Sequence, residues 1–171
     1  NPPYVRNEDI PKADNRSDPG HGTKHYYKDL VQDEVGADLS GRSDLHVYFW
    51  PHSTSFLKDD GYLGFLTSSQ WLGVKYGFKL QEWILKNFEI KAVLESIHEP
   101  WFVGARVVTA ATILRRQKSE EKRMNNTVRF VQLRKDLKNI IDHDGTTAGA
   151  VVANNAFRDE ILGLEDDVSN E

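Results

Sequence analysis

The feature that most constrains the fold is an alternation of helical and extended patterns between residues 44 and 133. Apolar side chains recur at helical spacing from Asp44 to Lys58 and from Tyr76 or Phe78 to Phe88, and an apolar run at 62–67 separates the two stretches. Three further extended patterns follow, at 90–97, 107–115 and 127–133. Such alternation is typical of an α/β domain with helices packed on a sheet. The order predicts one half of a doubly wound sheet, with a reversed last strand and a terminal β-hairpin made by the last two runs.

Proline and the capping residues refine the expectation for the first helix. Either Ser43 or Asp44 can act as its N-cap. Pro51 falls inside the helical pattern and removes one backbone hydrogen bond, so we expect a kink or a split near Trp50. The second helix carries its apolar residues on one face, namely Leu80, Trp83, Ile84 and Phe88.

The regions outside this alternation are more polar. Residues 5–43 contain several prolines and glycines, and we expect a long loop with one short helix at 25–31. Beyond residue 135 the sequence predicts a short helix, a linker of small residues, a weakly helical stretch and an acidic end, at 136–141, 142–150, 154–164 and 165–171. The chain therefore divides into an N-terminal motif with a polar loop, an α/β region, and a linker with a tail, at 1–43, 44–135 and 136–171.

Composition excludes several classes of protein. The chain has no cysteine, so it forms neither a disulfide framework nor a thiolate metal site. Its six histidines lack metal-ligand spacing, and we expect no metal site. The longest apolar run, 107–114, is too short to span a bilayer, so we expect a cytoplasmic protein without a membrane partner. The net charge of −4 argues against a broad phosphate-binding surface, and any contact with DNA should be local.

The first four residues carry the most specific chemical signal, the tetrapeptide Asn1-Pro2-Pro3-Tyr4. The Asn1 carboxamide oxygen and the Pro2 carbonyl can both accept hydrogen bonds from one planar NH₂ group, and neither proline offers a competing donor. Two such acceptors stabilise the positive charge that develops on the nitrogen as it attacks. The Tyr4 ring can lie flat against the heterocycle or amide that carries the NH₂ group. A Pro-Pro turn with an exposed tyrosine is the alternative interpretation of these residues.

Motifs further along the chain follow the tetrapeptide in a characteristic order. Asp44-Leu45-His46-Val47-Tyr48-Phe49 opens the first helix, and the strand at 62–67 leads into Ser68-Ser69-Gln70-Trp71-Leu72. With these motifs, residues 1–117 resemble the N(6)-adenine DNA methyltransferases of type II and type IIG restriction–modification systems, the Eco57I-like enzymes. The resemblance implies a partial Rossmann-like methyltransferase fold, S-adenosylmethionine as methyl donor, and DNA as a partner whose target adenine is flipped out of the duplex.

The resemblance also implies roles at the target base. Asn1 and Pro2 of the catalytic tetrapeptide match the acceptors for the adenine amine, and Tyr4 matches the ring that stacks on the flipped base. Phe102 matches a second aromatic residue that meets this base from another side. Trp101 takes that place if the register differs by one residue.

A second set of matches concerns the methyl donor. Phe49, with Tyr48 beside it, matches the aromatic position that packs on the adenine ring of S-adenosylmethionine. Both residues lie on a helical face, where aromatic side chains are ordinarily part of the core. His46 stands where the resembled enzymes have tyrosine, and the sequence does not explain this substitution.

The motifs that hold the rest of the donor do not occur in this sequence. We find neither a glycine-rich turn after a first strand nor an acidic residue that ends a second strand. We therefore expect a fragment that begins at the catalytic motif, lacks the donor-binding half and is inactive alone. Its expected partners are DNA, through the full-length enzyme, and the rest of the parent polypeptide. An exposed sheet edge at 62–67 would also permit self-association.

Two other functions remain open at this stage. The same tetrapeptide serves methyltransferases that act on a protein glutamine amide or on RNA bases, since each presents a planar NH₂ group. The chain can also be a non-catalytic module of a larger protein, which predicts a stable monomer with a covered sheet edge. The motifs at 44–49 and 62–72, with the long insertion after Tyr4, favour the DNA enzymes.

Overall fold

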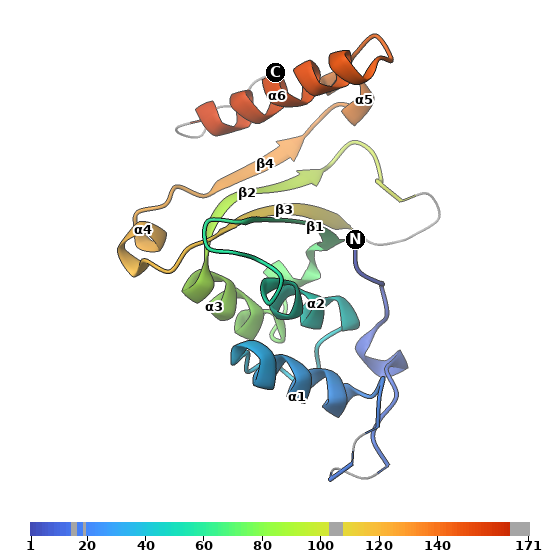
Figure 1. The fold of residues 1–171 in the computed structure, drawn as a ribbon. Coiled ribbons are helices and arrows are strands. Elements are labelled where there is room, and N and C mark those ends of the chain that lie inside the picture. Colours follow the sequence, from blue (N-terminus) through green and yellow to red (C-terminus); the bar gives the residue numbers. More distant parts are fainter. Residues whose placement is uncertain (15–16, 19, 103–107, 165–171) are drawn as a thin grey trace.

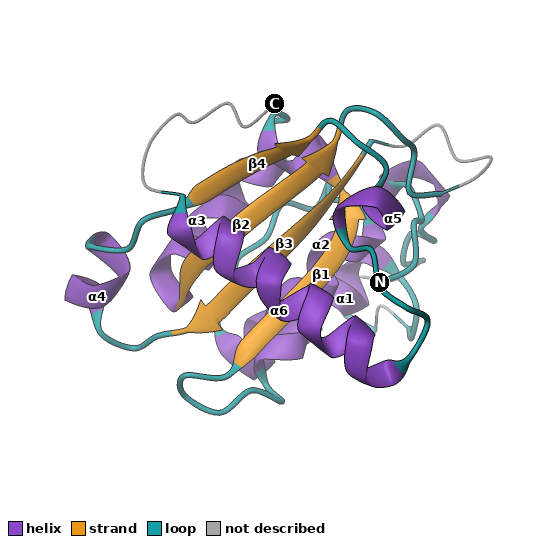
Figure 2. Cartoon of the chain, turned by 90° about the horizontal axis from the view of Figure 1, so that it is seen from above, coloured by secondary structure: helices purple, strands orange, loops and turns teal. Residues whose placement is uncertain are grey.

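The computed structural model describes residues 1–14, 17–18, 20–102 and 108–164 (Figure 1). Its centre is a four-stranded sheet in the order β1-β3-β2-β4, formed by Tyr62–Ser68, Thr109–Arg116, Phe88–Ser96 and Arg129–Leu133. One face carries α1, α2 and α3, at Lys24–Val35, Leu45–Thr54 and Gly77–Asn87. The other face is crossed by α6, at Thr147–Gly163 (Figure 2). Short helices η1, η2, α4 and α5 occupy Asn7–Asp9, Ser69–Leu72, Glu120–Met124 and Leu137–Ile140. The expected layered α/β arrangement is confirmed.

The order of the strands corrects one expectation. β3 lies between β1 and β2 and runs antiparallel to both, so the sheet contains a reversed strand, but this strand is β3 and not the last strand as expected. β4 pairs with β2 in parallel instead of forming a hairpin with β3. Both edges of β3 are already paired, and it has no free row of backbone groups for a third strand. The predicted hairpin between 107–115 and 127–133 is therefore wrong.

Side-chain hydrogen bonds fix the connection between β3 and β4 near the start of β2. Arg123, in α4, donates to the carbonyls of Leu85 and Gln117 at 3.2 and 2.7 Å. Asn126 Nδ2 donates to the carbonyl of Ile90, in β2, at 2.7 Å. These bonds attach the connection to the end of α3 and the start of β2, next to the edge of β2 on which β4 pairs. The position of β4 thus depends on contacts between residues distant in sequence.

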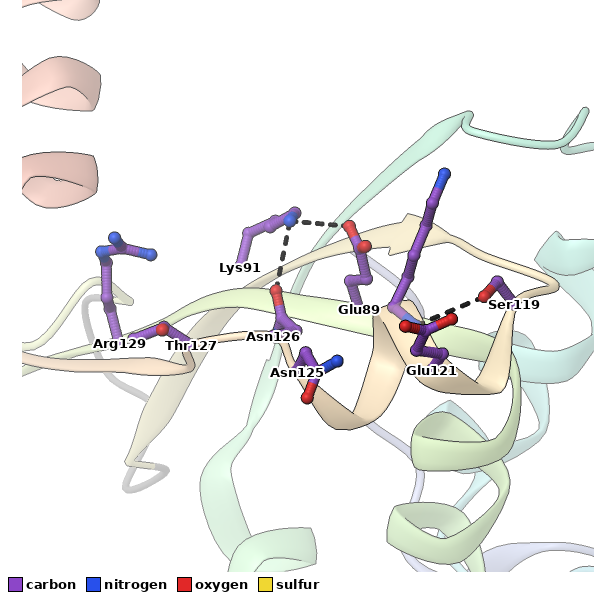
Figure 3. Close-up of a pocket in the computed structure, with 9 residues that line it drawn as sticks. Glu89, Lys91, Ser119, Glu121, Asn125, Asn126, Thr127 and Arg129 are labelled. Atoms are coloured by element: carbon purple, nitrogen blue, oxygen red, sulfur yellow. Dashed lines mark hydrogen bonds and ion pairs between the residues drawn. The ribbon is translucent and has the colours of Figure 1, made fainter.

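A β-bulge in β2 strengthens this connection. The β2–β3 register shifts after Ile90, which leaves Lys91 as the extra residue. Lys91 Nζ lies 2.6 Å from Glu89 Oε2 and donates to Asn126 Oδ1 at 3.1 Å (Figure 3). Arg115 approaches the same Glu89 oxygen at 3.5 Å. The nearly buried Glu89 carboxylate is thus compensated by two cations, as a buried charge requires.

The main core fills the space between the sheet and α1, α2 and α3. Trp50 and Leu114 are completely buried in it. The Trp50 ring lies edge-on to Phe65 and tilted against Trp71, with ring centroids 5.1 and 5.3 Å apart. Burial of apolar side chains of this size contributes roughly 2–3 kcal/mol each to folding.

Pro51 does not split α2. The helix continues through Pro51 to Thr54, so of the kink or split expected near Trp50 the split is absent. The Thr54 hydroxyl donates to the Trp50 carbonyl at 3.1 Å, and Arg116 donates to the Thr54 carbonyl at 2.6 Å. Pro51 is itself buried, so packing compensates for the missing N–H, and the two bonds satisfy carbonyls in the last turn of the helix.

Two helices are longer than their sequence patterns predict. α1 extends to Val35 instead of ending near residue 31, because Thr23 caps its start and Gly36, with φ of 69°, closes its end. α6 begins within the predicted linker 142–150, where the Thr146 hydroxyl accepts from the Gly149 N–H at 3.0 Å. The linker expected there is therefore shorter. In the described residues no helix has the length and apolar character that a membrane crossing requires.

Candidate active site around Tyr4

The N-terminal tetrapeptide lies beside the carboxyl end of β1 (Figure 1). Tyr4 donates its hydroxyl hydrogen to the carbonyl of Leu66 in β1, with the two oxygens 3.1 Å apart. Pro2 is buried, whereas Asn1 and Pro3 are exposed. Partial burial raises the pKa of the Tyr4 hydroxyl, so the phenol remains a neutral donor near physiological pH. One end of the motif is thus fixed on the sheet while the Asn1 amide stays accessible.

Phe102 lies next to Tyr4, although 98 residues separate the two in the sequence. Their ring centroids are 5.4 Å apart and the rings meet at 64°, an edge-to-face arrangement. Trp101 instead packs on the opposite face of the sheet, in the small cluster that contains Leu94 and Ile161. The structure therefore brings Phe102, and not Trp101, to the tetrapeptide.

His46 lies under Tyr4, a neighbour that the sequence did not predict. Its ring centroid is 6.5 Å from that of Tyr4, with 31° between the planes. His46 is 1 % exposed, and burial lowers its pKa although the nearby Asp44 carboxylate acts in the opposite direction. The imidazole is therefore neutral at pH 7 and supports the Tyr4 ring without adding charge.

Asp44 connects the chain after Tyr4 to two helices, and the sequence indicated only its capping role. It stands at the N-cap of α2 but makes no side-chain capping bond there. Its Oδ1 accepts the Asn7 N–H at 2.7 Å, and its Oδ2 accepts the Tyr76 hydroxyl at 2.9 Å. The Leu45 N–H donates to the Val5 carbonyl at 2.9 Å. Both ends of the segment 5–7 are thus fixed to the start of α2.

The two donor-binding candidates differ in their surroundings. Tyr48 lies in the main core, stacked on Tyr27 with centroids 6.0 Å apart. Its hydroxyl donates to the Ser40 carbonyl at 3.2 Å, and burial raises its pKa to about 12. Phe49 is half-buried and is not part of that core. Of the two, Phe49 has the ring surface that a planar ligand can contact.

A polar cavity lies at the other end of the sheet, beside α4 (Figure 3). It is lined by Glu89, Lys91, Asn125, Asn126 and Arg129, among others. Lys91 is occupied by Glu89 and Asn126, and Arg129 donates to the Leu162 carbonyl at the end of α6. These side chains stabilise the β3–β4 connection and are separated from Tyr4 by the length of the strands.

Taken together, the residues around Tyr4 form a wall of aromatic rings beside two oxygen acceptors. The rings of Tyr4 and Phe102 meet edge to face, and the exposed Asn1 and the buried Pro2 precede Tyr4 in the chain. Residues 1–102 match the family described as Eco57I restriction-modification methylase. The chain belongs to this family.

Curated relatives agree with this assignment. The chain is 28% identical over 102 residues to the type II methyltransferase M.BstVI of Geobacillus stearothermophilus, covering 56% of the chain and 14% of that protein. It is also 28% identical over 118 residues to the type II methyltransferase M.PaeR7I of Pseudomonas aeruginosa, covering 68% and 18%. The chain thus spans less than a fifth of the length of these relatives.

Solved structures show the fold. A protein from Listeria monocytogenes described as a class I S-adenosylmethionine-dependent methyltransferase superposes with a TM-score of 0.50 at 17% identity, over 77% of this chain and 37% of the other. A nuclease-deletion mutant of the type ISP restriction-modification enzyme LlaGI, solved with a DNA substrate mimic, gives 0.52 at 16% identity, over 96% and 14%. The fold of the chain is therefore similar to part of a class I methyltransferase.

Proposed function

We propose that this chain forms the catalytic-motif part of a DNA methyltransferase that modifies the N6 amine of a flipped adenine in a restriction–modification system. The observation that carries the proposal is the edge-to-face pair of Tyr4 and Phe102 beside Asn1 and Pro2. A target base inside a duplex is inaccessible, so it must leave the stack and enter a pocket with aromatic walls. Family membership supports DNA as the substrate class of these residues.

In this proposal the acceptors act on the amine. The adenine N6 lone pair is delocalised into the ring, and it must return to nitrogen before the nitrogen attacks. The Asn1 amide oxygen and the Pro2 carbonyl accept hydrogen bonds from the two amino hydrogens and stabilise the charge that develops on the nitrogen, which then releases one proton to water. Tyr4 keeps the base in place by stacking, with its hydroxyl held on Leu66. None of these steps needs a strong base among the residues of the motif.

The methyl donor has one fitting contact in this chain. Phe49 is half-buried on α2, between two residues that are buried in the core, and its exposed surface suits the adenine ring of S-adenosylmethionine. When bound, S-adenosylmethionine supplies an electrophilic methyl group. The glycine-rich turn and the acidic ribose ligand are absent from residues 1–171, so we propose that the full-length polypeptide supplies them and that the chain alone is inactive.

Substitution of Asn1 by Ala in the full-length polypeptide tests this function. The assay measures transfer of a labelled methyl group from S-adenosylmethionine to unmethylated duplex DNA, followed by identification of the modified nucleoside. The wild type should yield N6-methyladenine, and Asn1→Ala should lower the rate by a factor of about one hundred or more, the size expected for one lost charge-stabilising acceptor. Undiminished transfer by Asn1→Ala would refute the role of the motif. Methylation of release factor or RNA but not DNA would refute the substrate class.

A further inference from the structure

Asp44 occupies a helix N-cap position, yet its carboxylate is used elsewhere. An N-cap aspartate ordinarily accepts an N–H from the first turn of its own helix. In α2 this bond is absent, and both carboxylate oxygens instead accept donors from other segments, Asn7 and Tyr76. The carboxylate thus serves tertiary contacts in place of the cap of its own helix.

The two contacts join three parts of the candidate site. Asn7 belongs to the chain that leaves the tetrapeptide, and Tyr76 precedes α3 at the far side of the core. Lys24 of α1 donates to the Asn7 side-chain oxygen and so extends the network to a third helix. Burial and the Asp44 carboxylate both raise the pKa of the Tyr76 hydroxyl, which keeps it a donor across the physiological range.

The contacts fix the backbone on one side of Tyr4. The Tyr4 ring is held at its hydroxyl by Leu66, and the chain three residues later is held at Asn7 by Asp44. The Leu45 N–H also donates to the Val5 carbonyl. The Tyr4 hydroxyl is therefore attached to β1, and the backbone that follows Tyr4 is attached to the start of α2. Displacement of a positioned group by about 1 Å can lower a catalytic rate by a factor of about one hundred.

The geometry points to Asp44 as a positioning residue for the reaction, one that acts through Asn7 and Tyr76 to hold Tyr4 where the target base must stack. This inference rests on the proposed function, because it assigns the network a role in that same pocket. The proposed role of Asp44 does not include contact with the base. Its effect should therefore appear in the rate of methyl transfer and not in the affinity for DNA.

Three variants of the full-length polypeptide test the inference. Asp44→Ala removes both acceptors, Tyr76→Phe removes one hydroxyl and keeps the ring, and Asp44→Asn keeps an acceptor for Asn7 while its amide can donate to Tyr76. Asp33→Ala, an exposed aspartate on α1, is the matched control. Steady-state kinetics give kcat and the KM for duplex DNA, and hydrogen exchange gives the protection of the Asn7 amide.

We expect Asp44→Ala to lower kcat about tenfold or more and Tyr76→Phe to lower it about threefold to tenfold, with KM for DNA changed less than about twofold. Asp44→Asn should keep most of the wild-type kcat. In Asp44→Ala the Asn7 amide hydrogen should exchange with solvent faster than in the wild type. The positioning role is wrong if Tyr76→Phe has the kcat of the wild type and Asp44→Ala also has it. It is equally wrong if Tyr76→Phe has the kcat of the wild type and Asp44→Ala does not fold. Equal losses in kcat for Asp44→Ala and Asp33→Ala also overturn it. A wild-type protein that methylates no DNA would instead refute the proposed function.

Discussion

Substitutions at Tyr4 separate the two contributions of this residue, its hydroxyl and its ring. Tyr4→Phe removes the hydrogen bond to Leu66 and keeps the aromatic surface, whereas Tyr4→Ala removes both. In the proposed reaction the ring stacks on the flipped adenine and the hydroxyl only anchors it. The two variants should therefore differ strongly in methyl transfer.

The magnitudes follow from the geometry. The hydroxyl makes one neutral bond of 3.1 Å on a side chain that is 37% exposed, so water competes for it. Such a bond contributes about 0.5 kcal/mol, the low end of the usual range, which corresponds to a factor of about two in rate. Stacking of a base on an aromatic ring contributes about 1–3 kcal/mol, or a factor of about 5 to 150.

The assay is single-turnover methyl transfer by the full-length polypeptide, with the enzyme in excess over duplex DNA. We expect Tyr4→Phe to retain about half of the wild-type rate and Tyr4→Ala to lose at least four-fifths of it, by the factors above. Phe130→Ala, which removes a ring that is 72% exposed on β4, is the matched control and should leave the rate nearly unchanged.

The relation between the two Tyr4 variants decides the interpretation. If Tyr4→Phe is as slow as Tyr4→Ala, the hydroxyl and not the ring is what the reaction requires, and the stacking argument is wrong. If Tyr4→Ala keeps the wild-type rate, the aromatic wall with Phe102 has no part in holding the substrate.

Three further predictions concern stability, measured by urea unfolding. Because burial lowers the pKa of His46, the unfolded chain binds a proton below about pH 6.5 that the folded chain does not. The free energy of unfolding therefore falls as the pH falls from about 6.5 toward the lowered pKa. His46→Gln should lose less stability than the wild type between about pH 7.5 and 5, and equal losses would contradict this. Leu114→Ala should lower the free energy of unfolding by about 2–5 kcal/mol, whereas Leu162→Ala, at a 42% exposed position, should cost far less. Gly77→Ala would place a Cβ 1.9 Å from the Trp71 carbonyl oxygen and should cost about 1–3 kcal/mol, while Gly73→Ala, with open space around it, should not.

Local patterns in the sequence were sufficient for most of the regular structure. The helix at Gly77–Asn87 and the strand at Tyr62–Ser68 agree with their predicted ranges within two residues, because apolar spacing reports directly on which face is buried. The partner of β4 could not be predicted in this way. It depends on Arg123 and Asn126, whose donor groups find carbonyls on segments far away in the sequence.

In the candidate site, too, some features followed from the sequence and others depended on contacts between distant residues. The roles of Asn1 and Tyr4 came from the order of motifs, and they remain predictions until the variants are measured. The contact between Tyr4 and Phe102 needed the fold, since it joins the N-terminal tetrapeptide to the segment after β2. Asp44 and His46 belong to a motif of the resemblance, but their contacts with Asn7, Tyr76 and Tyr4 depend on the fold and could not be predicted from the sequence.

The central position of β3 has a consequence for synthesis of the chain on the ribosome. Among the described strands, β1 and β2 do not pair with each other, and each uses β3 as its antiparallel neighbour. Until residues Thr109–Arg116 have left the exit tunnel, β1 and β2 have no partner among the strands described before β3. Chaperones that bind exposed apolar segments can occupy these two strands during that interval.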